Sequence, residues 1–140
     1  MIPALTEAEE EKLARQAVRR LGGSWCSLSQ RRASKVHKGL CDARIRAYGV
    51  AWWYECKRDG GQLTREQLDF LSGEYQCEQI VFCGTAADLT PFLQMLASFR
   101  FDPTCSRDDL RNREAHLARC RMYGWATVQR VAARGFRRST

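Results

Sequence analysis

The sequence predicts an α/β fold in which helices flank a mixed β-sheet. Two segments with helical periodicity each begin with a capping box, one at Thr6 and one at Thr64. Between them, the largely apolar run at residues 50–57 is typical of an interior strand. A length of 140 residues with 44% hydrophobic content favours one domain with one sizeable core.

Charge and cysteine content narrow the class of protein. Lys and Arg number 23 against 16 acidic residues, for a net charge of +7 and a pI near 9.3, which favours nucleic acid or an anionic surface as the partner. The seven cysteines are scattered without a C-x-x-C pair, and the sequence has no signal-peptide pattern or long apolar span. We therefore expect a cytoplasmic protein with reduced thiols and no membrane association.

The first helix is expected from the Thr6 cap to Gly22-Gly23, with acids in its first turn and arginines in its last. Alternating apolar and polar residues at 24–29 predict the first strand. Residues 30–38 have little apolar content and indicate an exposed loop. This loop is expected either to bind phosphates or simply to be solvated. Its basic residues are Arg31, Arg32, Lys35, His37 and Lys38.

Two adjoining strands are expected at residues 40–48 and 50–57, joined at Gly49. So short a connection requires an antiparallel pair, which brings Asp42 toward the end of the sheet where Glu55 lies. The second strand also contains two aromatic residues that are expected to pack rather than to stack on bases, Trp52 and Trp53.

The next part of the chain predicts helix, strand and helix. After a turn at residues 58–61, the Thr64 cap opens a helix. Residues 78–83 indicate a short buried strand, and a further helix covers 87–98, broken early by Pro91. The expected order of the core is therefore α-β-β-β-α-β-α.

Residues 99–140 form a basic helical extension of the core at residues 1–98, and not an independent domain. They contain ten Arg and four acidic residues, which is +6 of the total charge. We expect a helix to about Met122, an interruption at Tyr123-Gly124-Trp125, and a short helix before Arg134-Gly135-Phe136-Arg137-Arg138. DNA binding and dimer formation are both plausible uses of this segment.

The pattern D-x12-E-x-K, formed by Asp42, Glu55 and Lys57, predicts the chemistry. Two carboxylates suit Mg²⁺ or Mn²⁺, and the backbone carbonyl of Cys56 is a candidate third ligand. Such a metal activates a bound water and neutralises charge on a phosphoryl oxygen, while Lys57 orients or activates that water. Phosphodiester hydrolysis is the reaction that this set of residues suits.

Other interpretations of these residue types stay open. Lys57 also suits a simple salt bridge with either acid at the end of the sheet. Cys105, His116 and Cys120 are the candidate zinc ligands, although only the last two have suitable spacing. His37 is a candidate second base, but a single histidine in a loop is usually incidental.

A longer motif carries a family resemblance. It consists of Gly39-Leu40-Cys41-Asp42, Glu55-Cys56-Lys57, Gly61, Leu63-Thr64 and Gln67. These residues resemble the VRR-NUC family of the PD-(D/E)XK nuclease superfamily, which has a restriction-endonuclease-like fold. The run from Glu55 to Gln67 is similar to the family pattern E-x-K-x3-G-x-L-[ST]-x2-Q without a gap. The resemblance covers residues 7 to 96, and family members usually have Pro where Cys41 stands.

The resemblance implies roles for individual residues. Asp42 and Glu55 would hold the catalytic metal, Lys57 would act on the water and Gln67 would support the site, although Gln67 equally suits its capping box. The family often adds a glutamate from its first helix. Glu10 is the expected one because it lies on the apolar, core-facing stripe of that helix. The acids ranked behind it are Glu7 and Glu11.

Together these features predict a homodimeric, metal-dependent DNA endonuclease that needs no small-molecule cofactor. Compact members of the family resemble phage and bacterial Holliday-junction resolvases, so junctions and flaps are the substrates that analogy suggests. The alternative is a DNA-binding or partner-binding module that keeps the fold without turnover. The residues expected to contact DNA are Arg31, Arg32, Lys35, His37, Lys38, Arg58, Arg137 and Arg138.

Overall fold

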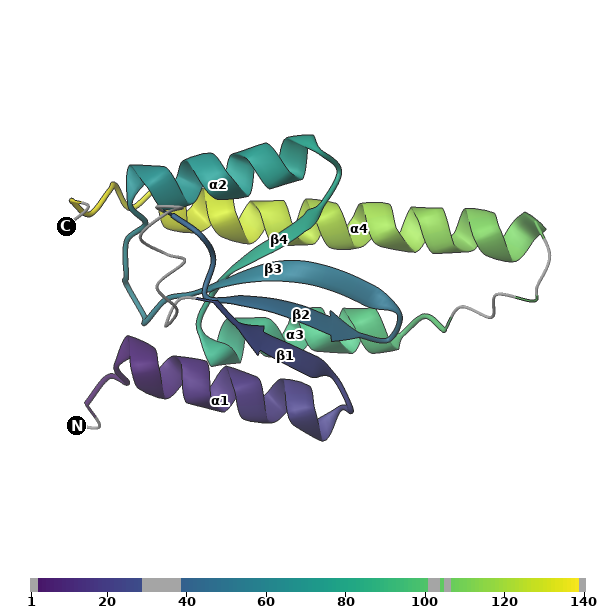
Figure 1. Cartoon of the computed structure of the whole chain (residues 1–140), viewed down its shortest axis with the longest axis horizontal. Coiled ribbons are helices and arrows are strands. Elements are labelled where there is room, and N and C mark those ends of the chain that lie inside the picture. Colours follow the sequence, from purple (N-terminus) through teal and green to yellow (C-terminus); the bar gives the residue numbers. More distant parts are fainter. Residues whose placement is uncertain (1–2, 29–38, 101–103, 105–106, 139–140) are drawn as a thin grey trace.

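The computed structural model describes residues 3–28, 39–100, 104 and 107–138 (Figure 1). Four helices and four strands are found in this part of the chain. In chain order they are α1 (Glu7–Arg20), β1 (Ser24–Ser27), β2 (Ala43–Ala47), β3 (Val50–Cys56), α2 (Arg65–Gln76), β4 (Ile80–Gly84), α3 (Ala86–Ala97) and α4 (Arg107–Ala132). The predicted order of the core is confirmed, and β1 and β2 are shorter than the sequence pattern suggested.

The four strands form one mixed sheet in the order β1-β2-β3-β4. The first two pairings are antiparallel, and β4 lies parallel to β3. Figure 1 shows α1 and α3 on one face of the sheet and α2 and α4 on the other. The predicted α/β class, with a mixed sheet between helices, is therefore confirmed.

The hairpin between β2 and β3 has the predicted antiparallel geometry. Ala47 pairs with Val50, which leaves Tyr48 and Gly49 as a two-residue turn. Both turn residues have positive φ angles, 55° and 73°. This is the conformation that matches the twist of the flanking strands, and it fixes which residues of the two strands face each other.

Both faces of the sheet are covered by apolar clusters. Trp52 is fully buried in the cluster under α1 and α3, where its ring meets Phe92 edge-on at 5.3 Å. Trp53 is half-buried on the other face and packs against Phe70 of α2. The prediction that both tryptophans serve packing is confirmed.

Helix α3 continues through Pro91, so the predicted early break is wrong. Pro91 is the sixth residue of the helix, where it removes the bond that its N–H would make to the carbonyl of Ala87. The helix nevertheless places four apolar side chains in the core, and their burial outweighs the loss of one hydrogen bond. These side chains are Leu89, Phe92, Leu93 and Leu96.

Helix α4 is also continuous, so the predicted interruption at Tyr123-Gly124-Trp125 is wrong. A Cβ atom on Gly124 would collide with the carbonyl oxygen of Val81 in β4. One turn later, the hydroxyl of Thr127 accepts a hydrogen bond of 3.0 Å from the backbone N–H of Cys83. Gly124 therefore allows a close approach of helix to strand, and it does not end the helix.

The basic C-terminal segment is part of the packed structure through α4. Cys120, Val128 and Val131 of this helix are buried in the two apolar clusters. No helix in the described part of the chain is long and apolar enough to cross a membrane.

Candidate metal centre

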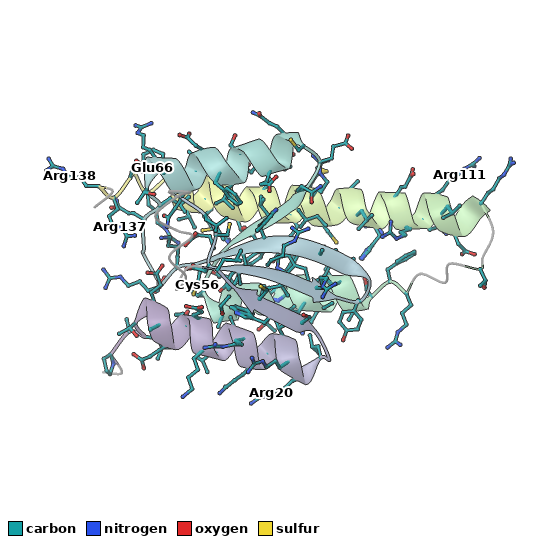
Figure 2. The ribbon with its side chains drawn as sticks, viewed as in Figure 1. Arg20, Cys56, Glu66, Arg111, Arg137 and Arg138 are labelled. Atoms are coloured by element: carbon teal, nitrogen blue, oxygen red, sulfur yellow. The ribbon has the colours of Figure 1, made fainter. Side chains whose placement is uncertain are left out.

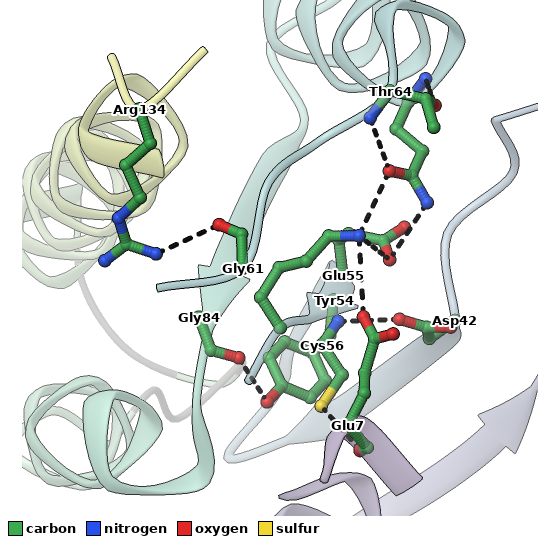
Figure 3. Close-up of polar contacts among 11 residues, drawn as sticks. Glu7, Asp42, Tyr54, Glu55, Cys56, Gly61, Thr64, Gly84 and Arg134 are labelled. Carbon is green, nitrogen blue, oxygen red and sulfur yellow. Dashed lines mark hydrogen bonds and ion pairs between the residues drawn. The ribbon is translucent and has the colours of Figure 1, made fainter. Parts of the chain in front are cut away.

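Three acidic side chains meet at the end of the sheet where β2 begins and β3 ends. Asp42 immediately precedes β2, and its Oδ2 accepts a hydrogen bond of 2.7 Å from the backbone N–H of Cys56 (Figure 3). Glu55 is the last but one residue of β3, and Glu7 is the first residue of α1. One oxygen from each of these three carboxylates lies within 4.8 Å of the others. The predicted proximity of Asp42 and Glu55 is therefore present.

Glu7 is the acid that α1 contributes, which corrects the expectation for Glu10. Glu10 does face inward and is buried, but its Oε2 accepts a hydrogen bond of 3.2 Å from the backbone N–H of Ala86. It therefore caps the start of α3 and lies outside the acidic cluster. Glu11 is not part of this group of three acids, and burial, followed by the charge of Asp42, raises its pKa.

Lys57 follows β3 directly and is 2% exposed. Its Nζ lies 3.4 Å from Oε1 of Glu7 and 3.7 Å from Oε2 of Glu55. It also donates a hydrogen bond of 3.1 Å to Oε1 of Gln67. These contacts hold a buried ammonium group against two of the three carboxylates, as the E-x-K spacing predicts.

Gln67 makes contacts that fit both of the roles considered for it. Its Oε1 accepts a hydrogen bond of 2.9 Å from the backbone N–H of Thr64, which completes the capping box of α2. The same oxygen accepts a hydrogen bond from the ammonium of Lys57, and the Nε2 group donates to Oε2 of Glu55 at 3.4 Å. The start of α2 is thereby joined to the end of β3.

Glu55 is almost completely buried beside the other carboxylates of the cluster. Burial, followed by the negative charge of Asp42, raises its pKa well above the ordinary value, and Lys57 only partly opposes this. Its Oε1 atom is buried and has no hydrogen-bond partner among the described residues. A divalent cation would supply the missing partner for this oxygen and offset the repulsion between the acids.

The donor set fits a small hard cation such as Mg²⁺ or Mn²⁺. The available ligands are carboxylate oxygens, and three of them leave room for waters or substrate oxygens in an octahedral shell. The carbonyl of Cys56, at the strand end between Glu55 and Lys57, stays a predicted additional ligand. Among the residues that the structure describes, Glu7, Asp42 and Glu55 form the only such group of three.

The predicted DNA-contacting residues fall into two sets. Arg58 and Arg137 line a hollow of about 130 Å³ beside Lys57 and Glu7. Arg138 is exposed next to Arg137, and Figure 2 shows both at one end of the molecule, with Arg111 at the other. The remaining five predicted residues, Arg31, Arg32, Lys35, His37 and Lys38, lie outside the described residues.

The alternative zinc site has two of its three predicted ligands in the described structure. His116 and Cys120 are buried one turn apart on α4, with 3.8 Å between Nε2 and Sγ. The ring of His116 stacks on Phe99 at 4.9 Å. Burial raises the pKa of the Cys120 thiol to about 11, and burial lowers that of His116. Cys105 lies outside the described residues, so the pair is an ordinary buried contact in what the structure describes.

Two features of the site were not found from the sequence. The choice of Glu7 depends on how α1 lies against the sheet and α3, because Glu10 bonds to Ala86 at the start of α3 while Glu7 meets the other two acids, and no local sequence signal gives that placement. The second feature is the return of the C-terminal segment, since Phe136 forms a parallel bridge with Leu63. Through that bridge Arg137 lies beside the candidate centre, although it is distant in the sequence from Glu7, Asp42 and Glu55.

Comparisons of this chain with protein-family models, with curated proteins and with solved structures find no match.

Proposed function

We propose that this chain is a Mg²⁺- or Mn²⁺-dependent DNA endonuclease of the PD-(D/E)XK type, similar to the VRR-NUC branch with its restriction-endonuclease-like core. The observation that carries the proposal is the meeting of three carboxylates, from Glu7, Asp42 and Glu55, with the buried ammonium of Lys57. The acids come from α1, the start of β2 and β3, so the arrangement depends on the whole fold.

Each residue has a chemical task in this proposal. Glu7, Asp42 and Glu55 would hold the metal, which when bound lowers the pKa of a water and neutralises negative charge on a phosphoryl oxygen. Lys57 would orient the attacking water and stabilise the charge that develops as the phosphodiester bond breaks. Gln67 would fix the position of Lys57, since its Oε1 accepts a hydrogen bond of 3.1 Å from the ammonium group.

A structural salt bridge is the competing explanation for Lys57. One carboxylate would be enough for that purpose, whereas three are gathered here. Glu55 is buried beside two further, partly exposed carboxylates, and it retains a buried oxygen with no hydrogen-bond partner among the described residues, which is costly without a cation. The excess of acid over base at this site therefore favours a metal centre.

A net charge of +7 supports DNA as the substrate, and it is consistent with binding through phosphate contacts. Preference for junctions or flaps, and assembly as a homodimer, stay predictions from the family resemblance. Size-exclusion chromatography with light scattering would measure the assembly directly.

The proposal is tested by cleavage of labelled linear, flap and four-way-junction DNA in Mg²⁺, Mn²⁺ or EDTA. We expect metal-dependent cleavage by the native chain, loss of at least about a hundredfold in Asp42→Asn and Lys57→Ala, and native activity in Asp69→Asn. Asp69 is the matched control because it is an exposed acid on α2.

Binding without cleavage under every metal condition would contradict the proposal and favour the non-catalytic DNA-binding module. Cleavage that survives Asp42→Asn would point to a contaminating nuclease or a different site.

A further inference from the structure

The segment after α4 is attached to the loop that joins Lys57 to α2. The backbone N–H of Arg137 donates a hydrogen bond of 2.8 Å to the carbonyl of Leu63, beside the bridge between Leu63 and Phe136. The guanidinium of Arg65 lies over the ring of Phe136, 4.4 Å from its centre. The backbone position of Arg137 is therefore fixed by contacts that do not involve its own side chain.

Two further hydrogen bonds tie the same elements together. Gln62 donates from Nε2 to the carbonyl of Arg134 at 2.8 Å. Arg134 in turn donates to the carbonyl of Gly61 at 3.1 Å (Figure 3). The turn at Gly60 and Gly61 is thus held from the side of the C-terminal segment, in addition to its own bond from the Gly61 N–H to the Arg58 carbonyl.

These contacts enclose a hollow of about 130 Å³ that adjoins the candidate metal centre. It shares Lys57 and Glu7 with the centre, and basic side chains enter it from both segments. Its lining consists of Glu7, Lys57, Arg58, Gly60, Gly61, Gln62 and Arg137.

The charges in this hollow favour an anion. Lys57 faces the Glu7 carboxylate at 3.4 Å, whereas the structure records no ion pair for Arg58 or Arg137 with any described residue. A guanidinium group suits a tetrahedral oxyanion because it presents paired N–H donors, and neither of these two has a carboxylate partner among the described residues. Gly60 leaves open space beside these groups, since a Cβ at this position would meet nothing within 4 Å, whereas a Cβ on Gly61 would lie 3.0 Å from the carbonyl oxygen of Arg58.

We propose that Arg137 and Arg58, with the Gly60-Gly61 turn, form a phosphate-binding subsite beside the metal centre, which would hold a DNA phosphate next to the scissile one. This role rests on the proposed nuclease function. The binding of phosphate to the hollow is a separate property that can be measured without cleavage. Arg137 then acts as a residue that positions the substrate backbone, while the acids and Lys57 act on the bond that breaks.

The first experiment measures phosphate binding without metal. Inorganic phosphate is titrated into the native chain, Arg137→Ala and Arg111→Ala, and the amide signals of Gly60 and Gly61 are followed by NMR, with acetate at equal ionic strength as the reference anion. Arg111 is the control because it is exposed on α4 at the other end of the molecule (Figure 2). We expect saturable shifts in the native chain and in Arg111→Ala, and binding weaker by about tenfold or more in Arg137→Ala. The bond from the Arg137 N–H to Leu63 does not need the side chain, so the unchanged remainder of the spectrum serves as the folding control.

The second experiment uses DNA substrates with a single neutral methylphosphonate placed in turn at each position near the cleavage site. At one position the neutral group should slow the native enzyme and have no added effect on Arg137→Ala, because both changes remove the same contact. Arg111→Ala should show the full effect of that methylphosphonate.

The outcomes separate the subsite from the nuclease. Equal phosphate affinity in the native chain and Arg137→Ala, or no saturable shift at Gly60 and Gly61, overturns the subsite whatever the cleavage assay gives. Phosphate binding that depends on Arg137 in a chain that cleaves no DNA keeps the subsite and refutes the nuclease. If cleavage occurs and no methylphosphonate position is coupled to Arg137, the subsite does not serve that substrate and the proposal fails.

Discussion

One oxygen atom, Oε1 of Gln67, accepts both the backbone N–H of Thr64 and the ammonium proton of Lys57, at 2.9 Å and 3.1 Å. The first bond stabilises the start of α2, and the second positions a residue of the candidate centre. Local helix capping and the geometry of the site are therefore coupled through a single side chain. This coupling can be separated by mutation.

Replacing Gln67 with Ala should reduce both stability and cleavage, whereas replacing Thr64 with Ala should mainly reduce stability. Each change weakens the capping box and should lower the free energy of unfolding by about 1 kcal/mol. Gln67→Ala also removes the acceptor for Lys57, so kcat should fall by about tenfold or more beyond the loss in Thr64→Ala. Urea unfolding and cleavage rates on both variants measure the two effects, and equal activity in the two variants would argue against a role of Gln67 at the centre.

Glu7 and Glu10 of α1 should differ in their effect on metal binding. Glu7→Gln removes one of the three clustered carboxylates and should weaken Mn²⁺ binding by at least about tenfold, measured by calorimetry. Glu10→Gln should leave Mn²⁺ affinity unchanged, because Glu10 bonds to Ala86 and lies outside the cluster. The reverse ranking would restore the sequence-based choice of Glu10.

The metal-free protein should lose stability as pH rises, through Glu55. Its pKa is raised in the folded state by burial and by the charge of Asp42, so the folded chain holds this proton more tightly than the unfolded chain does. The stabilising contribution is complete below the ordinary carboxyl pKa of 4.5 and is lost as pH rises toward the raised pKa. Thermal unfolding in EDTA should show this slope in the native chain and a flatter one in Glu55→Gln.

Bound metal should reverse that trend, because it requires the ionised carboxylate. The increase in Tm produced by Mn²⁺ should therefore grow with pH in the native chain and in the control Asp69→Asn. It should be largely absent in Glu55→Gln. A Tm increase that is independent of pH and survives Glu55→Gln would place the ion elsewhere.

Gly124 and Gly73 form a matched pair for testing the packing of α4. Gly124→Ala would place a methyl group against the carbonyl of Val81, and the forced movement should cost about 3 kcal/mol or more. Gly73→Ala lies on α2 with nothing within 4 Å of the added carbon, so it should stabilise by about 0.5–1 kcal/mol. Chemical denaturation of the two variants measures the difference, and similar changes in both would contradict the close approach.

The sheet and its acidic pair could be predicted because the information is local in the sequence. The connection at Tyr48-Gly49 forces an antiparallel hairpin, and alternation along β3 then fixes where Glu55 lies. Asp42 follows from the register of the same hairpin. Two capping boxes, at Thr6 and Thr64, likewise mark helix starts with residues only three positions apart.

The remaining features depend on contacts between distant parts of the chain. Glu7 and Glu10 both belong to the first turn of α1. Which of them joins the acidic cluster depends on the position of α3, which no local pattern in the sequence gives. Glycine is a residue type that often ends a helix, but Gly124 instead allows the backbone of β4 to lie close to α4. Arg137 reaches the centre through its bond to Leu63, which joins residues 74 positions apart.

The contact of α4 with β4 also determines whether a strand of another molecule can pair with this edge of the sheet. β4 is an edge strand, and an uncovered edge strand offers its N–H and C=O groups to strands of other molecules. The hydroxyl of Thr127 accepts a hydrogen bond from the N–H of Cys83, and Gly124 lies against the carbonyl of Val81. Helix α4 therefore blocks the addition of another strand at β4. Within the described residues, β1 is the other edge of the sheet, and its four residues would allow only a short pairing with an added strand.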